Sequence, residues 1–232
     1  MNAQGQVLQW REGLGWLVLV GGGDLEAGDL DGIYSEAIVV ADDFRPVMYI
    51  PTAAEDESEA EAILETWQAL GGTPGEVLPV WSLEDAENPE LAARLREAGV
   101  VFLGDGPNSL LLAEVLVDTL LGQVLAEVYA AGAVVVGQGA GAMVLGQVVA
   151  EFDPYGDAYV TLPGLDWVVR GVIEPHYGGL AESLRLQRLV ARRAGSFGLG
   201  LPPQVALALG PEGLVFTWGT GGQVTVALGP ER

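Results

Sequence analysis

The sequence predicts an α/β fold in which a mainly parallel sheet is flanked by helices on both faces. Short, almost continuously apolar runs alternate with segments that carry helix start and stop signals, as expected for strands buried on both faces. Near the C-terminal end, strand-like runs follow one another directly across Gly-rich turns. This second pattern predicts a small antiparallel C-terminal extension.

Five apolar runs in the first 150 residues have the length and composition of buried strands. Three segments between them are predicted to be helices. Acidic residues lie in the first turns of one, Pro89 begins another, and glycines follow their last turns. The expected strands are 16–20, 46–50, 77–81, 100–103 and 134–136, and the expected helices are 58–70, 89–98 and 107–131, the last with a candidate break at Gly122.

The pattern changes after about residue 150. A strand is expected at 167–173 and an amphipathic helix at 180–194, followed by short strands at 204–209, 214–218 and 223–228. No repeat, low-complexity linker or change of composition divides the chain. We therefore expect a single α/β domain over residues 1–232.

The composition limits the chemistry that the chain can perform. Its 232 residues include 32 acidic and 10 basic residues, one histidine and no cysteine, and every basic residue is arginine. Thiolate nucleophiles, disulfides, Cys-based or multi-histidine metal sites, and catalytic or P-loop lysines are excluded. What remains is oxygen chemistry with His176 as the imidazole base, and hard-cation binding by carboxylates. We expect no cofactor.

The net charge of −22 bears on partners and location. It disfavours nucleic acid and anionic membrane surfaces, and it most often serves as a solvated surface, with a cationic substrate as the alternative. The apolar run 14–20 is too short to span a bilayer, so a buried strand is expected there. Without signal, anchor or disulfide, the expected compartment is the cytoplasm.

A glycine-rich turn follows the expected strand 134–136. Gly137, Gly139 and Gly141 have the spacing of a nucleophile elbow, G-x-S-x-G, in which a strained turn lifts one side chain above the sheet. Gly139 stands at the central position and has no side chain to lift. The alternative interpretation is a plain glycine-rich turn between a strand and a helix.

His176 lies just after another expected strand, where α/β folds place their sites. A neighbouring carboxylate can fix the tautomer of the imidazole and raise its basicity. Glu174, Asp153 and Asp157 are candidates for this role, and the sequence does not choose among them.

The loop 104–108 also links a strand to a helix. Its backbone N–H groups, with the helix dipole behind them, suit an oxyanion or a carboxylate. Gly106 and Asn108 are candidate binding residues, although Asp105 and Asn108 fit turn and capping roles equally well. Thr52, at the exit of the strand 46–50, is a candidate second wall of the same pocket.

The one basic cluster lies in the expected helix 180–194. Its members are Arg185, Arg188, Arg192 and Arg193. Positive charge late in a helix complements the dipole, so a structural role is favoured, with Arg185 as a candidate contact for a ligand carboxylate. The acidic run 55–61 is interpreted as a solvated helix start.

Taken together, these segments resemble the cyanophycinase / dipeptidase E family of serine peptidases, whose fold is similar to the class I glutamine amidotransferase-like α/β fold. The resemblance covers nearly the whole chain in order. It rests on Gly21-Gly22-Gly23, Ile50-Pro51-Thr52-Ala53, Phe102-Leu103-Gly104-Asp105-Gly106, Gly137-Gln138-Gly139-Ala140-Gly141-Ala142, Glu174-Pro175-His176-Tyr177, Arg185-Leu186-Gln187-Arg188-Leu189 and Gly198-Leu199-Gly200-Leu201.

The resemblance implies roles for these residues. Position 139 is implied to be that of the nucleophilic serine, with His176 as its base and the Gly106 and Ala140 N–H groups as oxyanion donors. Gln138, beside the elbow, is a further candidate binding residue.

The chain departs from the family pattern at functional positions. Glycine stands at 139 in place of serine, Asp105 in place of the second loop glycine, and Glu174 in place of the aspartate before the histidine. Loss of the nucleophile is expected to lower the rate by several orders of magnitude. A glycine there relieves backbone strain of about 1–3 kcal/mol.

Three functions are therefore considered. We favour a homologue without peptidase activity that binds a small peptide or a carboxylate-bearing molecule. The first alternative is an active hydrolase that uses Ser109, Thr52 or water activated by His176. The second is a structural or assembly protein, because six tryptophans and a β-rich tail would suit a homodimer.

Overall fold

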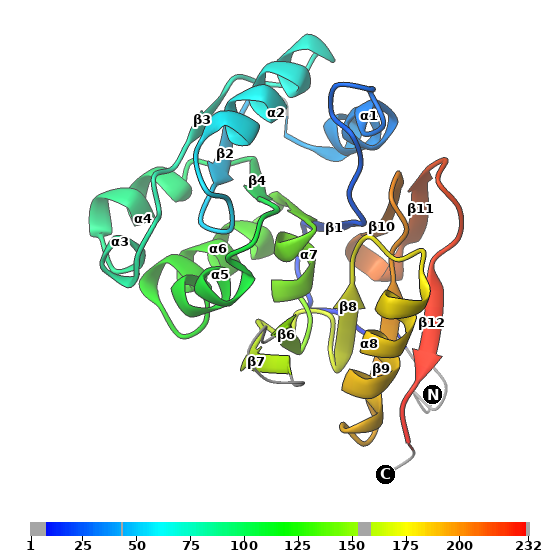
Figure 1. Cartoon of the computed structure of the whole chain (residues 1–232). Coiled ribbons are helices and arrows are strands. Elements are labelled where there is room, and N and C mark those ends of the chain that lie inside the picture. Colours follow the sequence, from blue (N-terminus) through cyan, green and yellow to red (C-terminus); the bar gives the residue numbers. More distant parts are fainter. Residues whose placement is uncertain (1–7, 43, 153–158, 231–232) are drawn as a thin grey trace.

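The computed structural model describes residues 8–42, 44–152 and 159–230. Its main sheet has seven strands in the order β11-β10-β1-β5-β4-β2-β3 (Figure 1). The strands are β1 (Trp16–Val20), β2 (Val47–Ile50), β3 (Gly75–Val77), β4 (Val100–Leu103), β5 (Val134–Gln138), β10 (Val205–Leu209) and β11 (Val215–Gly219). The neighbouring strands from β1 to β3 in this order pair in parallel, whereas β10 pairs with both β1 and β11 in the antiparallel direction. The predicted mainly parallel α/β sheet is thus confirmed.

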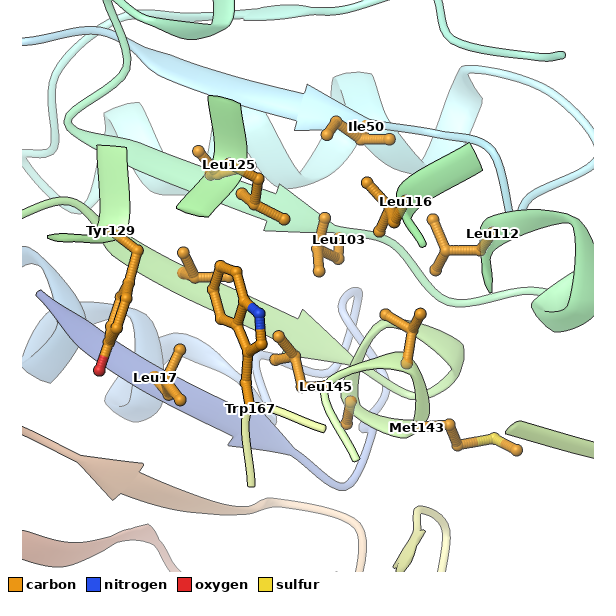
Figure 2. Close-up of a cluster of buried hydrophobic side chains, with 14 of the residues drawn as sticks. Leu17, Ile50, Leu103, Leu112, Leu116, Leu125, Tyr129, Met143, Leu145 and Trp167 are labelled. Atoms are coloured by element: carbon orange, nitrogen blue, oxygen red, sulfur yellow. The ribbon is translucent and has the colours of Figure 1, made fainter. Parts of the chain in front are cut away.

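Helices cover both faces of this sheet, as Figure 1 shows. The helices α1 (Asp31–Val40) and α2 (Ser58–Ala69) cover one face, and α3 (Leu83–Ala86), α4 (Pro89–Leu95), α5 (Ser109–Leu116), α6 (Leu120–Ala130) and α7 (Ala140–Val144) cover the other. Successive side chains of a strand alternate between the two cores. Leu17, which Figure 2 labels, and Leu19 belong to the core beneath α5, α6 and α7. Val18 and Val20 belong to the core beneath α1 and α2.

Two smaller sheets complete the fold. β8 (Gly171–Glu174) pairs in parallel with β9 (Phe197–Gly200), and β12 (Thr225–Leu228) pairs with β9 in the antiparallel direction. The helix α8 (Leu180–Ala191) packs on this sheet, and β6 (Val148–Phe152) forms an antiparallel hairpin with β7 (Tyr159–Pro163). This arrangement brings the end of β8, which carries His176, beside the main sheet.

Several predicted bounds differ from the structure. The strand expected at 77–81 ends at Val77, and Pro79 has no N–H to continue the pairing. The helix expected at 107–131 breaks before Gly122, because Asp118 has a φ of 59° and the Thr119 hydroxyl caps the new helix by accepting the Gly122 N–H at 3.1 Å. The strand expected at 167–173 begins only at Gly171.

The elements α1, α3, β9 and the β6–β7 hairpin were not expected from the sequence. Of the described helices, none is by itself both long and apolar enough to cross a membrane. α5 and α6 pass this test only as a pair, and the pair is bent by 79°.

Phe102 provides a test of the packing beneath α1 and α2. It is fully buried and contacts the rings of Tyr34, Tyr49 and Trp67. We expect Phe102→Ala to lower the free energy of unfolding by about 3–5 kcal/mol, measured by urea denaturation. Phe44 is 90% exposed, so Phe44→Ala is the matched control and should change stability by less than about 0.5 kcal/mol. Equal effects of the two substitutions would contradict this packing.

Candidate functional site

Loops that follow β1, β4, β5 and β8 meet at the carboxyl ends of the strands, where α/β folds hold their sites. An open cavity of about 450 Å³ lies there. Its lining includes Glu59, Asp105, Gly106, Ala140, Glu151 and His176. The structure therefore brings the predicted elbow, the loop 104–108 and His176 together.

The turn after β5 has the geometry of a strained strand-to-helix elbow. Gly139 precedes α7 with φ 52° and ψ −111°, in the left-handed region that favours glycine. Its N–H donates to the Val20 carbonyl at 3.2 Å, and the Gly141 N–H donates to the Gly104 carbonyl at 3.1 Å. The elbow is thus held between β1 and β4. A Cβ atom on Gly139 would overlap the carboxylate of Asp105.

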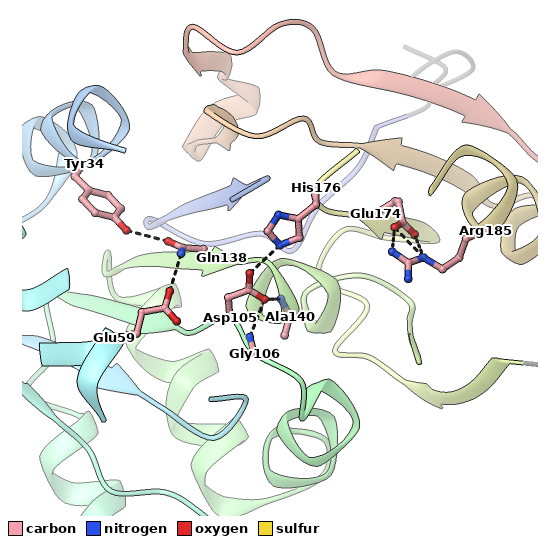
Figure 3. A network of polar contacts seen from close by, with 9 residues as sticks. All are labelled: Tyr34, Glu59, Asp105, Gly106, Gln138, Ala140, Glu174, His176 and Arg185. Atoms are coloured by element: carbon pink, nitrogen blue, oxygen red, sulfur yellow. Dashed lines mark hydrogen bonds and ion pairs between the residues drawn. The ribbon is translucent and has the colours of Figure 1, made fainter. Parts of the chain in front are cut away.

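The Asp105 carboxylate lies at the centre of the polar network in Figure 3. Its Oδ1 accepts the Gly106 N–H at 2.8 Å and the Ala140 N–H at 2.9 Å. Its Oδ2 lies 2.8 Å from His176 Nε2, which donates the proton because an ionised carboxylate only accepts. These are the same two N–H groups and the same imidazole to which the family resemblance gives roles.

Backbone contacts orient His176 toward Asp105. The histidine has a φ of 51°, and its N–H donates to the Gly21 carbonyl at 2.8 Å. Gly22 has a φ of 106°, and a Cβ atom there would overlap the imidazole at Cε1. Glycine at position 22 therefore lets the ring lie against the backbone after β1.

Glu174 is not the hydrogen-bond partner of the imidazole, contrary to one of the predictions. It is 1% exposed, and its two oxygens share the N–H of Arg185 Nε, at 2.8 and 2.9 Å, with a further hydrogen bond from Nη2. Arg185 lines the cavity, but its guanidinium is already committed to this ion pair. The other two candidate partners, Asp153 and Asp157, lie outside the described residues.

Thr52 is also corrected as a binding or attacking residue. It is fully buried, and its hydroxyl donates to the Val80 carbonyl at 2.7 Å. Asn108 holds the loop through a hydrogen bond from Nδ2 to the Ala54 carbonyl at 3.1 Å.

Gln138 contributes indirectly to the cavity. Its Oε1 accepts the Tyr34 hydroxyl at 2.9 Å, and its Nε2 donates to Glu59 Oε1 at 3.2 Å. Ser109 also lines the cavity, and its hydroxyl donates to Glu151 Oε1 at 2.7 Å. The same Glu151 oxygen accepts the Leu110 N–H, so this carboxylate caps α5.

Sequence reasoning missed Asp105, Glu59 and Glu151 as residues of the cavity. Asp105 was weighed as turn chemistry and Glu59 as part of a solvated helix start. The available signal for Asp105 was that both Asp105 and Gly139 depart from the pattern that the family resemblance implies. No comparable signal marked Glu151.

The hydrogen bonds decide the charge states at the site. Burial alone would raise the pKa of Asp105, but the bonds from His176, Ala140 and Gly106 outweigh it and lower that pKa. The hydrogen bond to Asp105 raises the pKa of His176 against the opposing effect of burial. Burial, followed by the charge of Asp105, raises the pKa of Glu59. Both shifts favour the ion pair between the His176 imidazolium and the Asp105 carboxylate over the neutral pair.

His176 is the one histidine of the chain, so its imidazole NMR signals are unambiguous. We expect its titration midpoint to lie above the ordinary value of 6.5, and to fall in Asp105→Asn because the stabilising charge is lost. An Asp118→Asn variant is the matched control at a distant acid and should leave the midpoint unchanged. A midpoint that is the same in Asp105→Asn and in the parent would contradict the ion pair.

The same pair predicts how stability depends on pH. Because the pKa of His176 is raised in the folded state, its ion pair contributes fully to the free energy of unfolding below pH 6.5. This contribution is lost as pH rises through the folded-state pKa. Because the pKa of Asp105 is lowered in the folded state, its contribution to the free energy of unfolding is present above pH 3.8. This contribution is lost as pH falls through the folded-state pKa. The stability difference between the parent and Asp105→Asn, measured by urea denaturation, should be greatest between these two pH values. A difference that does not change with pH would contradict the linkage.

The ion pair between Glu174 and Arg185 predicts a large stability effect. Removing the guanidinium leaves a buried carboxylate without its partner, so Arg185→Ala should cost about 3–5 kcal/mol in urea denaturation. Arg188 lies on the exposed side of α8, and Arg188→Ala is the control, with a change below about 0.5 kcal/mol. Similar losses in both variants would show that Glu174 does not depend on Arg185.

Comparison with known proteins supports the same fold. A peptidase from an acI-B1 Actinobacterium has a TM-score of 0.67 and 24% identity, over 94% of this chain and 96% of that chain. A protein of Listeria monocytogenes EGD-e named for peptidase E has a TM-score of 0.65 and 21% identity, over 89% and 98%. No curated protein matches the sequence significantly. The model of peptidase family S51 matches residues 17–215, and the chain therefore belongs to peptidase family S51.

Proposed function

We propose that this chain is a peptidase family S51 protein without serine peptidase activity, in which glycine replaces the nucleophilic serine and the pocket binds a small peptide. One observation carries the proposal. The Asp105 carboxylate occupies the space into which a side chain at position 139 would project. The peptidase names of the similar structures support the choice of a peptide as ligand.

Acyl transfer by a serine peptidase needs a hydroxyl, a base that can take its proton, and donors that hold the oxyanion. Gly139 supplies no hydroxyl. His176 Nε2 is hydrogen-bonded to Asp105, and so are the Gly106 and Ala140 N–H groups. The hydroxyl is absent, and Asp105 already occupies both the base and the oxyanion donors.

The charges favour a peptide over a free carboxylate as the ligand. Glu59, Asp105 and Glu151 line the cavity, and Arg185 is already paired with Glu174. A ligand carboxylate would meet repulsion from these acids, and the two basic side chains of the described lining, Arg185 and His176, are already paired with Glu174 and Asp105. A peptide brings an ammonium group and N–H groups whose protons the half-buried carboxylate oxygens of the lining can accept.

Ser109 supports a second candidate, an active hydrolase with a different nucleophile. Its hydroxyl lines the cavity and lies 2.7 Å from a Glu151 oxygen, close enough to pass a proton. The Leu110 N–H shares that oxygen, which favours a capping role for Glu151 over that of a base.

A fluorophosphonate probe and a panel of Asp-containing and isoaspartyl dipeptides test the proposal. We expect no labelling and no turnover, because loss of a nucleophile costs on the order of a millionfold in rate. Ser109→Ala and His176→Ala are the matched variants. Labelling that disappears in Ser109→Ala would establish the second candidate, and turnover that disappears in His176→Ala would overturn the proposed inactivity.

The same peptides test the binding part of the proposal. Because the cavity is lined by Gly106, Ala140 and His176, a bound dipeptide should shift the NMR signals of these residues in a saturable manner. The Phe44 amide, far along the chain on an exposed turn, is the internal control. A panel that shifts none of the three signals at millimolar concentration would contradict a retained peptide site.

A further inference from the structure

The Asp105 side chain does more than accompany the loss of the serine. We propose that Asp105 is the residue that decides whether position 139 can carry a nucleophile, because its carboxylate takes the space, the base and the oxyanion donors that a hydroxyl there would need. The inference rests on the proposed function, and it adds that residues 105 and 139 are coupled. Restoring a serine alone is then not enough to restore the chemistry.

The Asp105 carboxylate and a side chain at position 139 would compete for the same space. A Cβ atom on Gly139 would overlap Cγ and both oxygens of Asp105, so the two side chains compete for one volume. Asp105 comes from the loop after β4, and Gly139 from the elbow after β5, which are neighbouring strands. Because Asp105 is the flexible partner, it would have to turn away before a side chain at 139 could enter.

Three hydrogen bonds hold the Asp105 carboxylate in place. Turning away would break the hydrogen bonds from the Gly106 N–H, the Ala140 N–H and His176 Nε2. Each of these is charge-assisted and therefore stronger than a bond between neutral groups. The side chain is also 23% exposed, so water replaces these partners only in part.

Asp105 already occupies the two backbone N–H donors beside position 139. A backbone N–H has one proton, and the protons of Gly106 and Ala140 already point at Asp105 Oδ1. A carbonyl or carboxylate oxygen of a ligand thus finds no free donor at this point. The negative charge of Asp105 adds direct repulsion against any developing oxyanion.

Asp105 also occupies Nε2 of His176, the nitrogen that would act as the base. Nε2 of His176 donates to Asp105 Oδ2, while the Cε1–Nδ1 edge of the ring packs against Gly22. A hydroxyl at 139 needs an unprotonated Nε2 as acceptor. The bond to Asp105 keeps a proton on that nitrogen, so the introduced hydroxyl cannot pass its own proton there.

The covalent step that reports on this coupling is reaction with a fluorophosphonate. The hydroxyl oxygen introduced by Gly139→Ser attacks phosphorus, an O–P bond forms, the P–F bond breaks and fluoride leaves. The hydroxyl proton passes to His176 Nε2 once that nitrogen is free. The phosphonyl oxygen is then held by the Gly106 and Ala140 N–H groups, in the manner of an oxyanion.

The experiment compares three variants of the full chain by mass spectrometry of the labelled site: Gly139→Ser, Asp105→Ala/Gly139→Ser and Asp105→Asn/Gly139→Ser. We expect labelling of the Asp105→Ala double variant at least about tenfold faster than that of Gly139→Ser alone. Asparagine keeps the volume and an acceptor oxygen without the charge, so its double variant should remain slow. Equal rates for Gly139→Ser and the Asp105→Ala double variant would overturn the proposal, and fast labelling of the asparagine variant would overturn its steric part.

A second measurement keeps the proposal testable if the double variants fail to fold. In Asp105→Ala alone, sodium acetate should shift the Gly106 and Ala140 amide signals saturably, because their protons become free for an external carboxylate. In the parent, acetate should leave both amides unchanged. The same response to acetate in the parent and in Asp105→Ala would overturn the proposal.

These outcomes separate the coupling from the proposed function. If the parent chain itself is labelled or cleaves dipeptides, the proposed function fails. If the parent is inert and Gly139→Ser alone is fully reactive, the proposed function stands and the coupling between residues 105 and 139 fails.

Discussion

The carboxylate of Asp105 joins three segments that are far apart in the sequence. Its hydrogen bonds connect the loop after β4, the elbow after β5 and the histidine after β8. An acid can stay ionised in this half-buried place because two N–H donors and an imidazolium surround it. The same arrangement requires glycine at two positions. Gly139 leaves room for the Asp105 carboxylate, and Gly22 leaves room for the His176 imidazole.

Around this centre, the charged groups of the site are paired within the protein. Glu174 is held by Arg185, Glu59 by Gln138, and Glu151 by Ser109 and the start of α5. A site whose donors and base are satisfied internally is pre-organised, but it has little unpaired polarity left with which to stabilise a transition state. This is the physical reason for proposing a peptide-binding protein of the S51 family in place of an active peptidase.

The fold was largely predictable from the sequence because buried parallel strands have a strong local signature. β1 and β4 have the predicted bounds, since a glycine flanks each of their apolar runs at both ends. The helix α1 was missed because it ends in an apolar, β-branched run, Ile38-Val39-Val40, whose composition is as typical of a strand as of a helix. The elbow, His176 and the loop 104–108 were found because each follows a strand end. The pairing of Asp105 with His176 depends on side-chain contacts across 71 residues of sequence, for which a single sequence has no local signal.

The most direct test of the account is a pH titration of the Gly106 and Ala140 amide signals by two-dimensional NMR. If the Asp105 carboxylate holds both N–H groups, the two signals move together with a single midpoint, which lies below the ordinary carboxyl value of 3.8, and the movement disappears in Asp105→Asn. Two amides that titrate independently of each other, or that behave identically in Asp105→Asn, would contradict the central place given to this carboxylate.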